Sequence, residues 1–247
     1  MLQAQNWIRD SVATGFKIDQ YVLDPFNGLY ISDADGNIHN FDFKGEKRKT
    51  FNIRINEPVT DLSIPVSGRI GVFYENRQLY VFLDRFLNEQ SRLEIPELTN
   101  DYVLKAVLGS NNTLWLLTSF GDLIKYDLLI RKEVLRQNLS KEIEDLKSLK
   151  ISFHDHLILI HEENTLSLFD EFGNFLDQMD SVETNLKFYK NRLIVSNAFT
   201  YDLLDLISKK KESVPIPTPY RRTKKVLIGK DKHFHFFNKY FEVWAER

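Results

Sequence analysis

Leu166-Ser167-Leu168-Phe169-Asp170 is the clearest copy of the segment that decides the fold. It ends an amphipathic strand with an aromatic residue followed by an aspartate. Two similar copies and one looser copy come earlier, and they are Ile38-His39-Asn40-Phe41-Asp42, Ile124-Lys125-Tyr126-Asp127 and the looser Leu79-Tyr80-Val81-Phe82-Leu83-Asp84. The four aspartates are 42, 43 and 43 residues apart, and Asp205 follows 35 residues later. A period near 40 residues indicates a fold built from one repeated supersecondary unit.

Each repeat contains four short strand patterns. An apolar strand and a tight turn precede the marker, as in the turns Asp35-Gly36 and Phe120-Gly121, where glycine supplies positive φ. Another strand comes earlier, for example Val103–Leu108, and a weaker one follows the aspartate, for example residues 48–53. Four antiparallel strands per unit of about 42 residues predict the blade of a β-propeller.

The number of blades depends on how the ring closes. Five units are complete, whereas the sixth, residues 224–245, has room for only three strands. Residues 6–11, with Trp7 and Ile8, are predicted to add the missing outer strand and so cover an open sheet edge. The alternative is a five-bladed ring with a C-terminal hairpin. We predict an all-β fold, with residues 1–247 forming a single β-propeller of about six four-stranded blades closed by the N-terminal strand.

The marker aspartates are expected to have a structural role. A carboxylate at the end of a strand commonly accepts backbone N–H bonds from the turn that follows. We therefore predict that Asp42, Asp127 and Asp170 each accept such bonds.

The repeats resemble the quinoprotein-like and NHL-type propeller superfamilies, whose blades share this order of strand, turn, strand and aromatic-Asp. The likeness covers almost the whole chain. The chain has neither the Gly-His and Trp-Asp pairs of WD repeats nor the double glycine of kelch repeats, and no regularly placed tryptophan. The resemblance implies a fold and no particular activity.

Composition excludes several kinds of protein. The net charge is −2, so no global field favours nucleic acid, and no apolar run approaches the roughly 20 residues of a membrane-spanning helix. The absence of cysteine excludes disulfides, thiol catalysis and cysteine-held metals. Leu2-Gln3-Ala4-Gln5 resembles the remainder of a signal-peptide cleavage site. Export to the periplasm or cell surface is therefore favoured over the cytoplasm.

Motifs for catalysis are sparse. The stretch Asp33-Ala34-Asp35-Gly36-Asn37 fits a hairpin turn better than a calcium loop, because Lys44 stands where the loop needs a glutamate. The two imidazoles of His154-Asp155-His156 could share a metal if the turn is extended, but without a carboxylate at a confirmed position the segment is not predicted to bind one. The inner strands offer scattered polar residues, among them Asp19, Asp61, Lys105 and Lys187. We predict no enzyme activity, no cofactor and no resident metal.

Charge segregates between the two sets of turns. Strands alternate in direction, so turns after the first and third strands of each blade share one face, and these carry mostly Lys and Arg. The opposite turns carry mostly Asp and Glu, except for the basic end of the proline-rich segment 213–225. The candidate partner-binding residues are Lys47, Arg48, Lys49, Arg131, Lys132, Lys209, Lys210, Lys211, Arg221 and Arg222.

The sequence therefore predicts a non-catalytic binding or scaffold module that mediates protein–protein interaction in an exported or envelope-associated assembly. Peripheral contact with a membrane surface stays open as another use of the basic face. The alternative function is an exported, metal-dependent, lactonase-like hydrolase that uses the acidic face.

Overall fold

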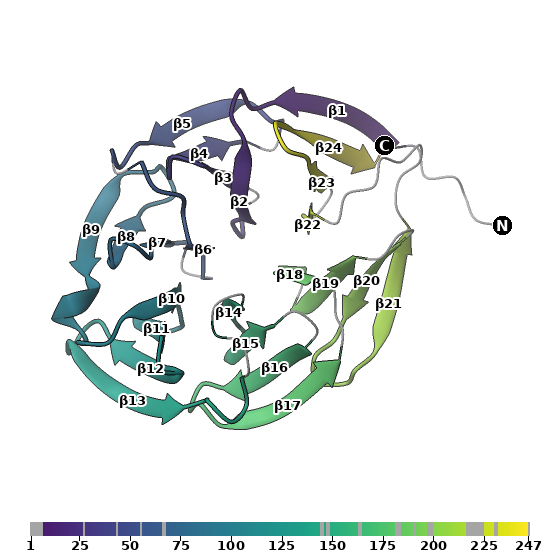
Figure 1. Cartoon of the computed structure of the whole chain (residues 1–247). Coiled ribbons are helices and arrows are strands. Elements are labelled where there is room, and N and C mark those ends of the chain that lie inside the picture. Colours follow the sequence, from purple (N-terminus) through teal and green to yellow (C-terminus); the bar gives the residue numbers. More distant parts are fainter. Residues whose placement is uncertain are drawn as a thin grey trace.

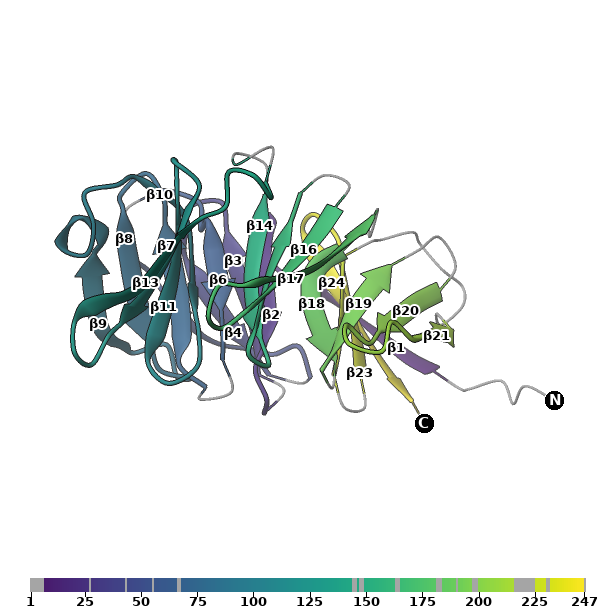
Figure 2. The ribbon, with the colours of Figure 1, turned by 90° about the horizontal axis from the view of Figure 1, so that it is seen from below.

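The structure is a computed structural model that describes residues 7–26, 28–42, 44–54, 56–65, 68–143, 146, 149–162, 165–180, 184–189, 191–196, 200–215, 225–229 and 232–246. Within them, six four-stranded antiparallel sheets stand around a central axis like the blades of a propeller (Figure 1). Seen from the side, the ring forms a disc (Figure 2). The predicted six-bladed, all-β fold is confirmed, because one short 3₁₀ helix, η1 (Ile95–Glu97), is the helical element of the described residues.

Each blade contributes one strand to each of four concentric layers. The innermost strands are β2 (Ile18–Leu23), β6 (Asp61–Ser63), β10 (Val103–Leu108), β14 (Lys150–His154), β18 (Thr184–Tyr189) and β22 (Val226–Ile228). The second strands are β3 (Leu29–Asp33), β7 (Ile70–Tyr74), β11 (Thr113–Thr118), β15 (Leu157–His161), β19 (Arg192–Ser196) and β23 (Lys232–Phe236). The third strands are β4 (Ile38–Phe41), β8 (Leu79–Leu83), β12 (Asp122–Asp127), β16 (Thr165–Asp170), β20 (Thr200–Leu204) and β24 (Tyr240–Glu246). The outermost strands are β5 (Lys47–Phe51), β9 (Glu89–Glu94), β13 (Lys132–Asn138), β17 (Phe175–Asp180), β21 (Lys211–Pro215) and β1 (Trp7–Ala13).

The ring closes by pairing the two ends of the chain. Strand β1 lies antiparallel to β24, in a register that runs from Trp7 opposite Glu246 to Ala13 opposite Tyr240. The last blade thus combines three C-terminal strands with one N-terminal strand, as predicted. The five-bladed alternative is wrong.

The core lies between neighbouring blades. All five residues of β7 and all six of β11 are buried, because both faces of a middle strand pack against another blade. Tyr30 of one blade, for example, belongs to the same apolar cluster as Val72 of the next. Outer strands are largely solvent-exposed, as in β9. This packing explains the continuous apolar runs that the sequence shows.

The marker aspartates tie down the turns that follow the third strands. Asp84 Oδ1 accepts N–H bonds from Phe86 and Asn88, both 2.8 Å long. Asp170 Oδ1 repeats the same bonds two and four residues on, at 2.9 and 2.8 Å. The corresponding bonds of Asp42 and Asp127 confirm the predicted role.

Within the part of the chain that the structure describes, no helix is both long and apolar enough to span a lipid bilayer.

Candidate active site

A cavity of about 1640 Å³ occupies the centre of the disc and is lined by residues from all six innermost strands. It extends to the turns that follow these strands, including residues 109–112 and His156, and it also reaches Asp84 and Arg85. These turns define one face of the disc, which we call the mouth face. It is the face on which the sequence placed the basic turns.

Every blade supplies an ionisable side chain to the channel from its inner strand or from the residue just before it. We call this set the charge ring, and its members are Asp19, Asp61, Lys105, Lys150, Lys187 and Lys225. Asp61 and Lys150 are the first residues of β6 and β14, whereas Lys187 lies in the middle of β18. Inner strands end at the mouth face, so most of the ring lies at the deep end of the channel. Four lysines and two aspartates make it formally cationic.

The members of the charge ring influence one another electrostatically. Asp61 lies within the field of Lys105 and Lys187. The charge of Lys150 acts on Lys187, and the charge of Lys225 acts on Lys150. Asp19 also interacts with Lys225. The ring therefore acts as one coupled group of charges.

Asp61 and Lys187 form the most perturbed pair in the channel. Burial raises the pKa of Asp61 to about 6, although the Lys105 charge and a 3.0 Å bond from the Ala106 N–H oppose the rise. Burial lowers the pKa of Lys187 to about 8, assisted by the Lys150 charge and opposed by Asp61. At neutral pH Asp61 is therefore a carboxylate and Lys187 an ammonium. Both pKa values lie close enough to 7 for these groups to exchange protons with a substrate.

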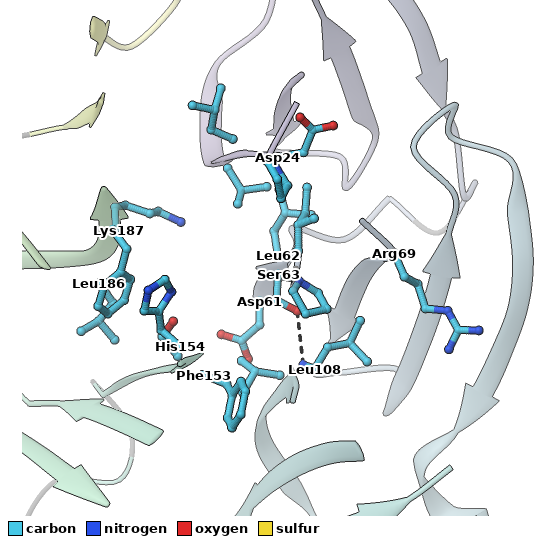
Figure 3. A pocket seen from close by; sticks show the side chains of 18 of the residues that line it. Asp24, Asp61, Leu62, Ser63, Arg69, Leu108, Phe153, His154, Leu186 and Lys187 are labelled. Atoms are coloured by element: carbon cyan, nitrogen blue, oxygen red, sulfur yellow. Dashed lines mark hydrogen bonds between the residues drawn. The ribbon is translucent and has the colours of Figure 1, made fainter. Parts of the chain in front are cut away.

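His154 stands nearer the mouth, at the end of β14. Its ring stacks on Phe188 with centroids 3.9 Å apart, and its Nε2 lies 3.3 Å from Asn191 Oδ1. Burial lowers its pKa, so the imidazole is neutral at pH 7. In Figure 3 the side chains of Asp61, His154 and Lys187 point into the channel from three different blades.

The candidate partner-binding residues lie elsewhere. They occupy the starts of the outer strands β5, β13 and β21 and the turns before them, and the described ones are exposed. These strands belong to three alternate blades, so the residues do not form one patch (Figure 1). Arg48 pairs with Asp42, and Lys209 pairs with Asp177, so part of this charge is compensated. Arg221 and Arg222 lie outside the described residues.

Sequence reasoning noticed four members of the charge ring as scattered polar residues and missed Lys150, Lys225 and the channel position of His154. The sequence does contain a spacing that could have located the charge ring. In the first five blades the ring residue stands 18 to 23 positions before the marker aspartate, for example Asp61 before Asp84 and Lys187 before Asp205. Aligning the repeats on that aspartate would have placed these side chains at one level.

No three His, Asp or Glu side chains gather as metal ligands within the described ranges. The motif from Asp33 to Asn37 is a hairpin turn, in which Asp33 Oδ1 accepts N–H bonds from Asp35 and Asn37 at 3.0 and 2.9 Å. His156 contacts Glu171, with Nδ1 3.2 Å from Oε2. The described channel is not filled by apolar side chains, the arrangement that would have favoured a scaffold. Its described carboxylates are not gathered as metal ligands, the arrangement that would have favoured a lactonase-like hydrolase.

The fold and the cavity define a six-bladed β-propeller with an open, charged central channel. Solved structures of lyases are among the proteins that it resembles. Virginiamycin B lyase from Staphylococcus aureus matches with a TM-score of 0.62 and 10% identity, over 98% of this chain and 100% of that one. A streptogramin B lyase matches with a TM-score of 0.66 and 11% identity, over 99% and 100%.

A third match is a catalytically inactive His-to-Ala variant of the Staphylococcus aureus enzyme with quinupristin, with a TM-score of 0.63 and 9% identity over 98% and 100% of the two chains. No family model matches the chain. No curated protein matches it either. At these identities the likeness establishes the fold.

The predictions of a non-catalytic scaffold and of no enzyme activity are contradicted by these neighbours, because the three solved propellers named above match nearly the whole chain and are lyase structures. The error has a physical reason. The prediction relied on contiguous catalytic motifs, whereas a propeller assembles its channel from single residues on separate blades. Such a site leaves no motif in the sequence.

Proposed function

We propose that this chain is an enzyme of the lyase type, which breaks a bond in a small molecule held in the central channel. The observation that carries the proposal is the convergence of Asp61, His154 and Lys187 in one large cavity (Figure 3). Its support from outside the chain is that the matching propellers act as streptogramin B lyases. The likeness of the repeats to quinoprotein-like and NHL-type propellers stays a proposal about ancestry.

Asp61 and Lys187 are suited to an elimination. The Asp61 carboxylate takes a proton from carbon, the adjacent C–O or C–N bond breaks, and a double bond forms between the two carbons. The Lys187 ammonium then gives a proton to the departing oxygen or nitrogen. The proton on Asp61 returns to the Lys187 amine, directly or through solvent, so no atom is gained or lost by the protein.

The environment of this pair favours the reaction. A carboxylate with a pKa of about 6 is a stronger base than an ordinary aspartate yet is mostly ionised at pH 7. The surrounding lysines stabilise negative charge that develops on the substrate, and a site shielded from bulk water strengthens that effect. His154, neutral and near the mouth, would contact substrate as it enters.

The proposal is tested by product mass. Purified chain is incubated with virginiamycin B, quinupristin and a panel of small cyclic and linear esters and amides, and the products are analysed by mass spectrometry. Elimination opens a ring without change of mass, or yields two fragments whose masses add up to that of the substrate. Products heavier by one water would show hydrolysis and would contradict the proposal.

A further inference from the structure

Two cations of the charge ring lack a partner. In the described part of the chain, the ammonium groups of Lys105 and Lys187 have neither a hydrogen-bond nor an ion-pair partner. The described contact of the Lys187 ammonium is with the ring of Tyr21, whose centroid lies 5.4 Å away. The charge of Asp61 acts on both lysines, but one carboxylate cannot neutralise two ammonium groups. The two lysines therefore leave room for a further negative charge in the channel.

Tyr21 gives a second, independent observation. It lines the cavity, is only 4% exposed, and its hydroxyl has no hydrogen-bond partner among the described residues. Its ring is held in place by stacking on Phe236, with centroids 3.9 Å apart. Buried hydroxyl groups in folded proteins are nearly always hydrogen-bonded. The hydroxyl is closed to solvent within the apolar cluster that contains Phe236, whereas the ring face lies under the Lys187 ammonium, so Tyr21 holds this cation at the channel wall.

The other members of the charge ring also favour an anion in this part of the channel. Lys150 and Lys225 add two further positive charges to the same level of the channel, and Asp19 and Asp61 remove two. Burial also raises the pKa of Asp19, although Lys225 opposes the rise, which makes its negative charge easier to lose than that of an ordinary aspartate. The deep end of the channel thus keeps an excess of positive charge.

We propose that the channel binds an anionic group, a carboxylate or phosphate, of its ligand through Lys105 and Lys187. This inference rests on the proposed function for the statement that the ligand is a substrate, and it names the class of that substrate as small molecules with a fixed negative charge. The anion enters from the mouth face and ends at the charge ring.

The test compares two probes of matched shape. Isothermal titration calorimetry measures binding of succinate and of its uncharged amide, succinamide, to the full chain, and inorganic phosphate serves as the second oxyanion. We expect succinate to bind, succinamide to fail, and the succinate affinity to fall as salt is raised. A response to phosphate but not to succinate would assign the site to phosphate. Equal binding of succinate and succinamide, or binding of neither oxyanion, would overturn the inference.

Three variants locate the binding. Lys105→Met should weaken succinate about tenfold or more, the loss expected for one charge-assisted hydrogen bond. Tyr21→Phe keeps the ring under the Lys187 ammonium and removes only a hydroxyl that is closed to solvent, so it should leave succinate affinity unchanged. The matched control is Lys132→Met, because Lys132 is exposed on the outer strand β13 and should leave affinity unchanged. Full affinity in Lys105→Met would contradict the inference.

A measurement on the unaltered protein guards against variants that fold poorly. Lysine acetylation is quantified by mass spectrometry with and without saturating succinate. Succinate should protect Lys105 and Lys187 and leave Lys132 equally reactive, whereas equal labelling of all three would overturn the inference. Failure of the proposed function is distinguishable: succinate binding without turnover would remove the lyase proposal alone, and turnover of neutral substrates without succinate binding would remove this inference alone.

Discussion

The outer turns and the inner strands of this propeller follow opposite rules. After the third strand of successive blades, the turn repeats the same residue and the same bonds, as Asp84 and Asp170 show. At the deep end of the channel, the blades place different ionisable residues at equivalent positions, aspartate in the first two blades and lysine in the other four. A turn residue that recurs from blade to blade serves folding, which every blade needs. Channel residues that differ between blades serve the channel, which the molecule has once.

The largest expected effect comes from breaking the ring itself. Deleting residues 1–13 removes β1, the outer strand of the last blade, and the ion pair between Arg9 and Glu242. The uncovered edge of β24 should cause aggregation and loss of a cooperative melting transition, measured by light scattering and circular dichroism. Deleting residues 1–6, which precede β1, is the matched control. A truncated chain that melts like the full one would show that closure is dispensable.

The difference between the channel and the turns is tested most sharply by replacing one aspartate in each. Asp61→Asn should lower kcat/KM by about 10²- to 10⁴-fold, the usual contribution of a general base. Its melting temperature should stay the same or rise, because a buried carboxyl with a raised pKa destabilises the folded protein once it is ionised. The counterpart Asp170→Asn, at a turn aspartate that does not line the cavity, should keep its activity. Equal activity losses in the two variants would show that the channel has no special role.

Turn aspartates should instead affect stability. Asp170→Ala removes an acceptor of two backbone bonds and of a third, 2.9 Å bond from the Asn174 side chain. The expected cost is about 1–2 kcal/mol, with a fall in melting temperature of a few degrees and unchanged kcat/KM. Urea unfolding measures the cost. A variant as stable as the parent would remove the structural role of the marker.

The smallest effect is expected at the rim, by which we mean the candidate partner-binding residues at and before the starts of the outer strands. Changing Lys47, Arg48, Lys209 and Lys210 together to Glu alters exposed charges, two of which have aspartate partners. Exposed ion pairs contribute little, so the free energy of unfolding should change by less than about 1 kcal/mol. Turnover should also be unchanged, because the rim lies away from the channel. A large loss of activity would show that the mouth face takes part in substrate entry, and binding of a protein partner there stays a prediction.

Most of the fold was predictable because propeller blades repeat in sequence. The spacing of Asp42, Asp84, Asp127 and Asp170 fixed the blade length, and the missing outer strand of the last blade pointed to the N-terminus. The site was not predicted, because Asp61 and Lys187 are 126 residues apart in sequence and neither belongs to a motif. The shifted pKa values of these two residues come from burial and from neighbouring charges, and both arise only when the ring closes.

Acid–base chemistry in the channel is tested most directly by the pH dependence of kcat/KM. Asp61 must be ionised and Lys187 protonated, so activity should rise with a limb near pH 6, where the pKa of Asp61 lies, and fall with a limb near pH 8, where that of Lys187 lies. The acidic limb should disappear in the residual activity of Asp61→Asn. A profile without either limb, or one that Asp61→Asn leaves unchanged, would contradict the account.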